Sequence, residues 1–322
     1  MSIRSVNILY FLGIVLAVAC SQTEVEQDPI CFAPVASKST KAIISGTTYP
    51  TGESFVVSAY YNGTDDYFND LEASYSSAAA FWETSSSQYW PLRGSLTFNA
   101  FSPASASSSG ITIDANGVSV TDYTIQTAQQ MATDFCYASA TVADCTIHPD
   151  AVPLTFAHAL SQVVFRVKAD AYYSTASRTV RIMLTSLDMQ GIYSVGDFSY
   201  GTWENQSAEN YYTLSNTSTE LTYDGSNRPE TIDVCSYLFL PQELGPNAAI
   251  TVGYDLVQTV SGNVYTLSNS PVTIPLGAPL TEWQPGKKYI YTLNIGMNNL
   301  ITFSVSTVGW QDESENIIVE EN

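Results

Sequence analysis

Basic residues and histidine are scarce in this chain. Its 322 residues include 11 Lys and Arg against 31 Asp and Glu, which gives a formal net charge of −20, and only two His. Nucleic acids and anionic lipid surfaces attract positive charge, so this imbalance argues against both as partners. Hydrophobic residues still make up 45% of the chain, so the excess of acid does not indicate a disordered protein.

Motifs of catalysis and of metal binding are also missing. The sequence contains no G-x-S-x-G, no H-E-x-x-H, no phosphate-binding glycine loop and no C-x-x-C spacing. We therefore expect no enzymatic activity, no cofactor and no metal. His158 has the best claim to be a general base, but its alternating apolar surroundings favour a packed or rim histidine. His148, in a turn beside Pro149, is interpreted as a loop residue.

Other readings of the polar and aromatic residues are weaker. A pair of buried carboxylates would indicate a glycoside hydrolase, but the acidic clusters lie in loop or tail contexts that favour solvated surface. Asp65, Asp66 and Asp70 could form a calcium loop, yet no EF-hand spacing supports it. The five tryptophans could stack on sugar rings, but burial is the default for residues beside strands and turns. They are Trp82, Trp90, Trp203, Trp283 and Trp310.

The N-terminus is predicted to be an export signal. Arg4 precedes an apolar run that is too short to span a bilayer comfortably, and the run ends in Ala17-Val18-Ala19-Cys20. Small residues directly before a Cys are typical of lipoprotein processing, so we predict a signal peptide over residues 1–19 and lipidation of Cys20. An ordinary signal peptide or a membrane anchor explains this pattern less well. The lipid would attach the chain to the cell outer membrane.

The residues after Cys20 are polar and acidic, so residues 20–41 are expected to be a lipidated tether or propeptide on the cell surface. Outside the cytoplasm, Cys136 and Cys145 could close a small loop, and whether they pair stays open.

Helical periodicity is almost absent, and short alternating runs separated by turn residues replace it. Asn116-Gly117 and Ser261-Gly262-Asn263 each predict a hairpin. This pattern predicts an all-β fold of two β-sandwiches, which we place at residues 42–151 and 152–322. The predicted strands are Ser54–Tyr61, Leu96–Phe101, Gly110–Ile113, Val118–Val120, Leu154–Val167, Thr179–Leu187, Ile250–Val257, Val264–Leu267, Lys288–Ile295 and Ile301–Ser306.

Several strings, in this order along the chain, resemble the fimbrillin family, the FimA-like and Mfa-like subunits of type V pili. They are Ser39–Pro50, Phe55–Tyr61, Tyr89–Leu92, Leu96–Ser102, Val152–Leu160 and Ile301–Trp310.

The resemblance implies two tandem transthyretin-like β-sandwiches that reach the surface as a lipoprotein. In that family a trypsin-like protease cuts after a basic residue and removes the first strand with its lipid. A C-terminal strand of a neighbouring subunit then fills the groove, so that a head-to-tail homopolymer, the fimbrium, forms. Lys41 and Ala42 occupy the position of the cut, where the family often has Arg, and Lys38 is a second basic residue nearby.

The donor strand is expected near the C-terminus. Candidates are Ile301, Phe303 and Val305 in one apolar strand and Ile317, Ile318 and Val319 in the acidic tail. These residues could instead cap the protein's own second domain. The alternative function is a permanently lipid-anchored surface protein, either a fimbrial anchor or a protein that binds a host or bacterial glycan or protein.

Overall fold

The computed structural model describes residues 27–36, 49–125, 133–278, 280–297, 301–310 and 319–320. Within these residues all regular structure is β-strand, apart from the short 3₁₀ helices η1 (Ala104–Ser109) and η3 (Cys145–Ile147). This confirms the predicted all-β fold. No helix in the described part of the chain is long and apolar enough to cross a membrane. The predicted signal peptide, Cys20, Lys38, Lys41 and Ala42 lie outside the described residues.

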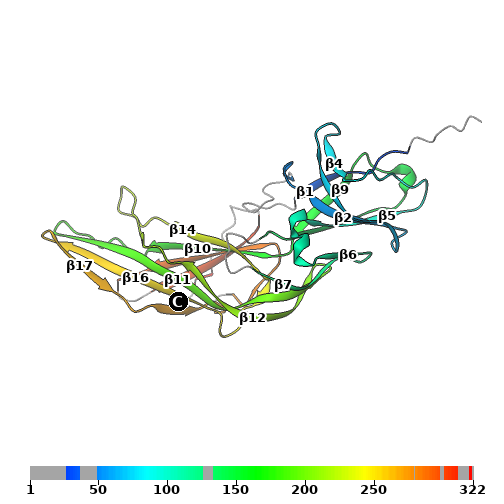
Figure 1. Ribbon diagram of the computed structural model, residues 1–322. Coiled ribbons are helices and arrows are strands. Elements are labelled where there is room, and N and C mark those ends of the chain that lie inside the picture. The colour runs from blue at the N-terminus through cyan, green and yellow to red at the C-terminus, as the bar shows by residue number, and fades with distance from the viewer. Residues whose placement is uncertain are drawn as a thin grey trace, which may run out of the picture.

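The first part of the chain forms a closed β-barrel, which lies at the right of Figure 1. Around the barrel its strands follow the order β1 (Cys31–Ala36), β4 (Phe81–Thr84), β3 (Asp65–Ser76), β2 (Phe55–Tyr61), β5 (Leu96–Ser102), β8 (Cys136–Val142) and β9 (Val152–His158). Alternating apolar residues point inward and form one core, because successive side chains of a strand face opposite sides.

A second, elongated part lies at the left of Figure 1 and consists of facing sheets. One sheet has the order β14 (Ile232–Phe239), β10 (Ser161–Ala169), β20 (Lys287–Ile295), β21 (Ile301–Gly309) and β22 (Val319–Glu320). The largest hydrophobic core lies between this sheet and the next, and it includes Phe165, Leu184, Ile250 and Tyr291.

The facing sheet has eight strands and is organised around β11 (Arg178–Ser199), which is 22 residues long. Its other strands are β6 (Thr112–Asp114), β7 (Gly117–Thr124), β12 (Thr202–Ser215), β13 (Thr219–Glu220), β16 (Ala249–Val260), β17 (Asn263–Ser268) and β18 (Val272–Pro275). The short strands β15 (Gln242–Glu243) and β19 (Glu282–Trp283) form a separate pair.

Strands β6 and β7 connect the two parts. They precede β8 of the barrel in sequence, yet β7 pairs with the far end of β11, with Val195 opposite Thr124. A third core lies at this junction and combines side chains from both parts, among them Val56, Phe101, Phe198 and Trp203. The two parts are therefore joined by a shared sheet edge and a shared apolar core.

Both predicted hairpins are confirmed. β6 and β7 meet at Gly117, and β16 and β17 meet at Ser261 and Gly262, which both have positive φ. The predicted strand Leu154–Val167 is in fact two strands, because β9 pairs in the barrel and β10 pairs in the second part. The assignment of residues 42–151 and 152–322 to separate domains stays a prediction.

Candidate functional site: the slot filled by strand β1

Strand β1 closes the barrel between two strands that do not otherwise meet. It pairs in parallel with β9 from Phe32 opposite Val152 to Ala36 opposite Phe156, and it pairs antiparallel with β4. β9 pairs with its other neighbour, β8, only at Ala157 and His158. Most of β9 therefore has β1 as its only strand partner.

The side chains of β1 fill the adjacent part of the barrel core. Ile30, directly before the strand, is 2% exposed and Phe32 is 0% exposed, while Val35 is 39% exposed. The Phe32 ring packs edge-on against Phe55 and Phe98, with ring centroids 5.8 and 5.5 Å apart. The strand therefore presents an apolar face inward and a more exposed face outward, and it covers the edges of its two neighbouring strands.

The position of β1 in the chain makes the slot between β4 and β9, which β1 fills, a candidate functional site. β1 lies within the segment expected to be a tether, after the predicted lipidation site Cys20 and before Lys38 and Lys41. Sequence reasoning did not identify the strand. The Ile30–Val35 segment is short and contains Pro34, which weakens a strand signal.

The predicted donor residues lie in the second part of the molecule. Ile301, Phe303 and Val305 belong to β21, which pairs antiparallel along its whole length with β20 of the second part. Val319 begins β22 and is opposite Val305. Ile317 and Ile318 lie outside the described residues. In this structure β21 is a strand of the chain's own sheet, and donation by these residues stays a prediction.

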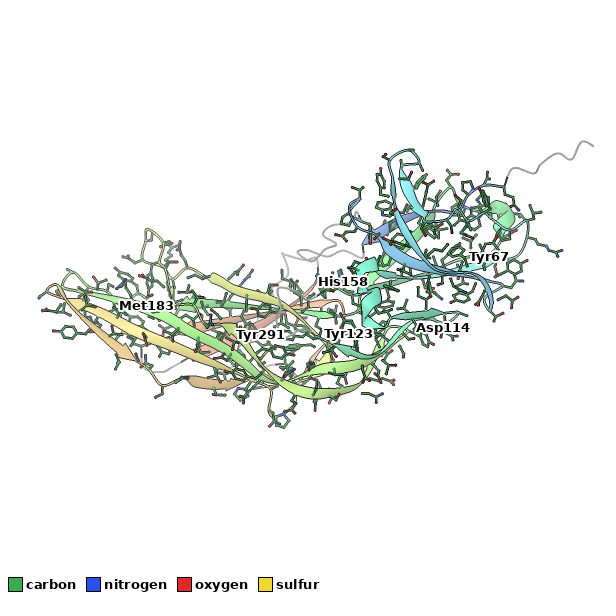
Figure 2. The ribbon with its side chains drawn as sticks, viewed as in Figure 1. Tyr67, Asp114, Tyr123, His158, Met183 and Tyr291 are labelled. Carbon is green, nitrogen blue, oxygen red and sulfur yellow. The ribbon has the colours of Figure 1, made fainter. Side chains whose placement is uncertain are left out.

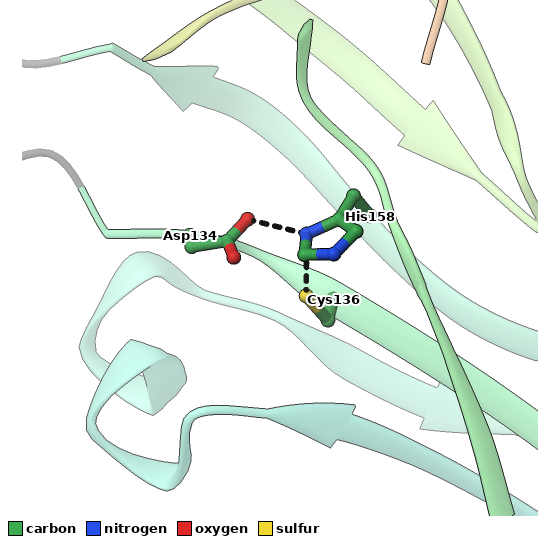
Figure 3. Close-up of side chains that lie close together, drawn as sticks. All are labelled: Asp134, Cys136 and His158. Carbon is green, nitrogen blue, oxygen red and sulfur yellow. Dashed lines mark hydrogen bonds and ion pairs between the residues drawn. The ribbon is translucent and has the colours of Figure 1, made fainter. Parts of the chain in front are cut away.

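A second cluster of polar side chains lies where β8 begins and β9 ends, and His158 places it between the barrel and the second part (Figure 2). Figure 3 shows His158 with its Nδ1 atom directed at both Asp134 and Cys136. Nδ1 is 2.9 Å from Asp134 Oδ1 and 3.3 Å from Cys136 Sγ. Asp134, Cys136 and His158 are 2%, 0% and 4% exposed. His158 is thus the packed histidine that the sequence predicted, but its partners were not foreseen.

The geometry of this cluster does not suit nucleophilic catalysis. In a Cys–His–Asp triad the thiol and the carboxylate contact different ring nitrogens, whereas here both contact Nδ1. Burial and the neighbouring Asp134 carboxylate raise the pKa of the Cys136 thiol well above its ordinary value, so the reactive thiolate is disfavoured.

The remaining predicted residues behave as structural groups. All five tryptophans are at most 9% exposed, which confirms core packing over sugar stacking. His148 stacks on Trp90 with ring centroids 4.5 Å apart and lies 3.5 Å from the Asp28 carboxylate. Cys136 and Cys145 are both free thiols, and so are the other described cysteines. Asp65, Asp66 and Asp70 are exposed residues of strand β3.

The outer face of the five-stranded sheet carries an open depression of about 620 Å³. Its lining includes Arg166, Lys168, Thr292 and Ser304, and Arg166 Nε lies 2.6 Å from Asp233 Oδ1. The lining contains no aromatic ring, so the depression lacks the flat apolar surface on which a sugar ring stacks.

Comparison with known proteins identifies the class of this molecule. The family profile of fimbrillin-like proteins matches residues 40–310, which is most of the chain. The protein belongs to the fimbrillin-like family, and it is a fimbrial or adhesive subunit rather than an enzyme. No curated protein sequence matches the chain.

Solved structures of similar proteins come from species of Bacteroides and Parabacteroides. A candidate cell adhesion protein of Bacteroides uniformis aligns at 14% identity with a TM-score of 0.49, covering 88% of this chain and 98% of the other. A second candidate cell adhesion protein, from Parabacteroides distasonis, aligns at 12% identity with a TM-score of 0.49 and covers 90% and 99%. A candidate adhesin of Bacteroides thetaiotaomicron aligns at 8% identity with a TM-score of 0.48 and covers 92% and 98%.

Proposed function

We propose that the protein is a structural or adhesive subunit of a surface fimbrium that assembles by proteolytic processing and donor-strand exchange. The precursor is held at the outer membrane by a lipid on Cys20. A cut after Lys41 separates β1 and its lipid from the rest of the barrel, and a C-terminal strand of a neighbouring subunit takes the place of β1. The observation that carries this proposal is the position of β1, which closes the barrel from the far side of the cut.

A strand that replaces β1 must provide both backbone hydrogen-bond partners and apolar side chains. The backbone of β9 from Val152 to Phe156 loses its strand partner, and the inward faces of Ile30 and Phe32 leave the core. Burying one such apolar side chain stabilises a protein by about 1.5–3 kcal/mol. A strand with apolar residues at alternate positions restores both interactions. Donation from one subunit to the next never closes on itself, so it builds a fibre.

The tail is the less costly donor of the two predicted segments. Phe303 and Ile301 pack against the large core of the second part, and Val305 is 3% exposed within it. Removing β21 would therefore open that core. Ile317 and Val319 are two positions apart, so in an extended strand they face the same side, as Ile30 and Phe32 do in β1. We propose residues 317–319 as the inserted segment and β21 as the strand that anchors them.

The decisive experiment compares Lys41→Gln with the matched variant Lys38→Gln in the native bacterium. N-terminal sequencing of the surface protein and migration on an unheated denaturing gel report processing and polymerisation together. We expect wild type and Lys38→Gln to begin at Ala42 and to form heat-sensitive ladders. Lys41→Gln should begin at acylated Cys20 and run as a monomer. Ladders from a Lys41→Gln chain that keeps Cys20 would contradict the proposal.

A truncated chain tests separately whether the C-terminal tail is the donor strand. A chain that ends at Trp310 lacks residues 311–322 and should be processed normally but remain monomeric, because β21 stays in its own sheet. Polymerisation of this truncated, folded chain would exclude the tail as donor.

A permanently lipid-anchored surface protein is the alternative. It predicts that wild type itself begins at acylated Cys20 and never forms ladders, in which case the search turns to a glycan or protein ligand.

A further inference from the structure

We propose that Asp134, Cys136 and His158 bind a divalent metal ion of the zinc class at the junction of the barrel and the second part. In the part of the chain that the structure describes, this is the single group of at least three His, Cys, Asp or Glu residues whose ligand atoms approach closely enough to share an ion. These atoms all lie within 4.8 Å of one another.

The backbone brings the three ligands together. Cys136 at the start of β8 is directly opposite His158 at the end of β9, so both side chains leave the same face of this antiparallel pair. Asp134 is two positions before Cys136, which puts it on the same side of an extended chain. This Asp-x-Cys pattern with a cross-strand His is not visible as a spacing motif, because the His lies 22 residues further along the chain.

Two of the three ligand distances are close to those of a metal site. Zinc bonds of about 2.0–2.3 Å in tetrahedral geometry separate ligand atoms by about 3.3–3.6 Å. His158 Nδ1 lies 2.9 Å from Asp134 Oδ1 and 3.3 Å from Cys136 Sγ. Asp134 and Cys136 lie within 4.8 Å of each other, and metal binding would draw these two ligands together. Nitrogen, sulfur and carboxylate oxygen together favour zinc over magnesium or calcium, which prefer oxygen alone.

An independent observation concerns unpaired polar atoms. Among the described residues, Asp134 Oδ2 and His158 Nε2 are buried and have no hydrogen-bond partner. A buried carboxylate oxygen without a partner is costly, and it marks a place where a ligand belongs. A metal held by Oδ1 takes Oδ2 into its coordination sphere as a fourth ligand, which satisfies this atom without a water.

The charges of the site also balance with a metal. A divalent cation with one carboxylate, one thiolate and one neutral imidazole forms a cluster of zero net charge. This is what a site with 0–4% exposure requires, because isolated buried charge is strongly disfavoured. Binding releases the thiol proton to solvent as the metal–sulfur bond forms, and the imidazole proton that Nδ1 donates to Asp134 moves to Nε2, so the ring stays neutral. The site is closed, so the ion is structural, and it is taken up during folding.

Metal binding at this site would also restrain the start of the C-terminal tail. The His158 ring stacks on Trp310, with ring centroids 4.2 Å apart and planes at 12°. Trp310 directly follows β21 and precedes the acidic tail. A metal on Nδ1 fixes the imidazole ring that Trp310 covers, and so it ties the base of the tail to the barrel.

The full chain is unfolded with a chelator present and refolded with zinc, with cobalt or with chelator alone. We expect one metal ion per chain by mass spectrometry, a thiolate-to-cobalt charge-transfer band in the near ultraviolet, and a melting temperature several degrees above that of the chelator-treated protein. Less than a tenth of an equivalent of metal with no thiolate band would overturn the proposal.

Variants identify the ligands. Cys136→Ser should abolish the thiolate band, and Asp134→Asn should weaken metal binding at least tenfold. The matched control is Cys145→Ser, which alters another buried free thiol and should leave metal content and band unchanged. If Cys136→Ser does not fold, wild-type stoichiometry together with the Cys145→Ser band still decides. A band lost in Cys145→Ser would place the metal elsewhere. None of these readouts depends on fimbrial assembly.

Discussion

Phe32 should be the anchor that keeps β1 in the barrel of the unprocessed chain. Its side chain is 0% exposed and contacts Phe55 and Phe98 at ring-centroid distances of 5.8 and 5.5 Å. Replacing it with Ala removes the ring and leaves a cavity, which for a buried Phe costs about 3–5 kcal/mol of the free energy of unfolding. We expect Phe32→Ala to lower the stability of the precursor barrel by this amount in urea denaturation.

Val35→Ala is the matched control, because Val35 lies in the same strand but is 39% exposed. Its cost should be about 0.5 kcal/mol. Amide hydrogen exchange localises the effect, since Phe32→Ala should accelerate exchange in β9, whose Val152–Phe156 segment pairs with β1. Equal losses of unfolding free energy in the two variants, or unchanged amide exchange in β9, would refute the view that inward side chains hold β1 in the barrel.

Two further changes test the local structure. Gly191→Ala should destabilise the protein by more than about 3 kcal/mol, because Gly191 has a φ of +71° and an added Cβ would lie 2.2 Å from a backbone carbonyl oxygen. Gly63→Ala, at φ +84° in open space, should cost only about 1 kcal/mol, and equal losses would contradict the clash. Burial alone would raise the pKa of Asp114, but hydrogen bonds from the Tyr200 hydroxyl and from backbone N–H groups hold this pKa below its usual value. These hydrogen bonds therefore stabilise the folded protein at neutral pH, and the stabilisation is lost as acid protonates the carboxylate. Tyr200→Phe should therefore lower neutral-pH stability by at most about 1 kcal/mol in urea titrations, and the loss should shrink below about pH 4. Tyr265→Phe, at another exposed tyrosine, should show no such pH dependence.

Local features of the fold were predictable because their causes are local. Alternation of apolar and polar residues fixes which side of a strand is buried, and the turn signals Asn116-Gly117 and Ser261-Gly262 mark the hairpins, which reverse at Ala115-Asn116 and at Ser261-Gly262. Burial of the tryptophans followed from their size and their position beside strands.

The pairing of distant segments was not predictable. Leu154–Val167 is continuous and apolar, and nothing within it indicates that its first half joins the barrel and its second half joins another sheet. The separation occurs at Ala159 and Leu160, which belong to the junction core between the two parts. Likewise, the β6–β7 hairpin was visible, but its attachment to the end of β11 depends on a partner about 75 residues away.

The candidate site was missed for a related reason. Strand β1 is only six residues long and contains Pro34, so it is a poor strand former by itself. β1 is recognisable as a strand only once the edges of β4 and β9 are seen on either side of it. The polar cluster was missed because cross-strand neighbours carry no sequence spacing.

The two prolines of the β1–β9 pair remove no hydrogen bond from it. Ala33 lies opposite Pro153 and Pro34 lies opposite Leu154, and a parallel ladder in this register takes its N–H groups from Ala33 and Val35 of β1 and from Leu154 and Phe156 of β9. In the unprocessed chain β1 is therefore held by this ladder, by the inward side chains of Ile30 and Phe32, and by its covalent link to the barrel. In the proposed mechanism a single cut after Lys41 removes the covalent link and the lipid anchor together. A donor strand then has to supply both the backbone partners of β9 and apolar side chains at alternate positions.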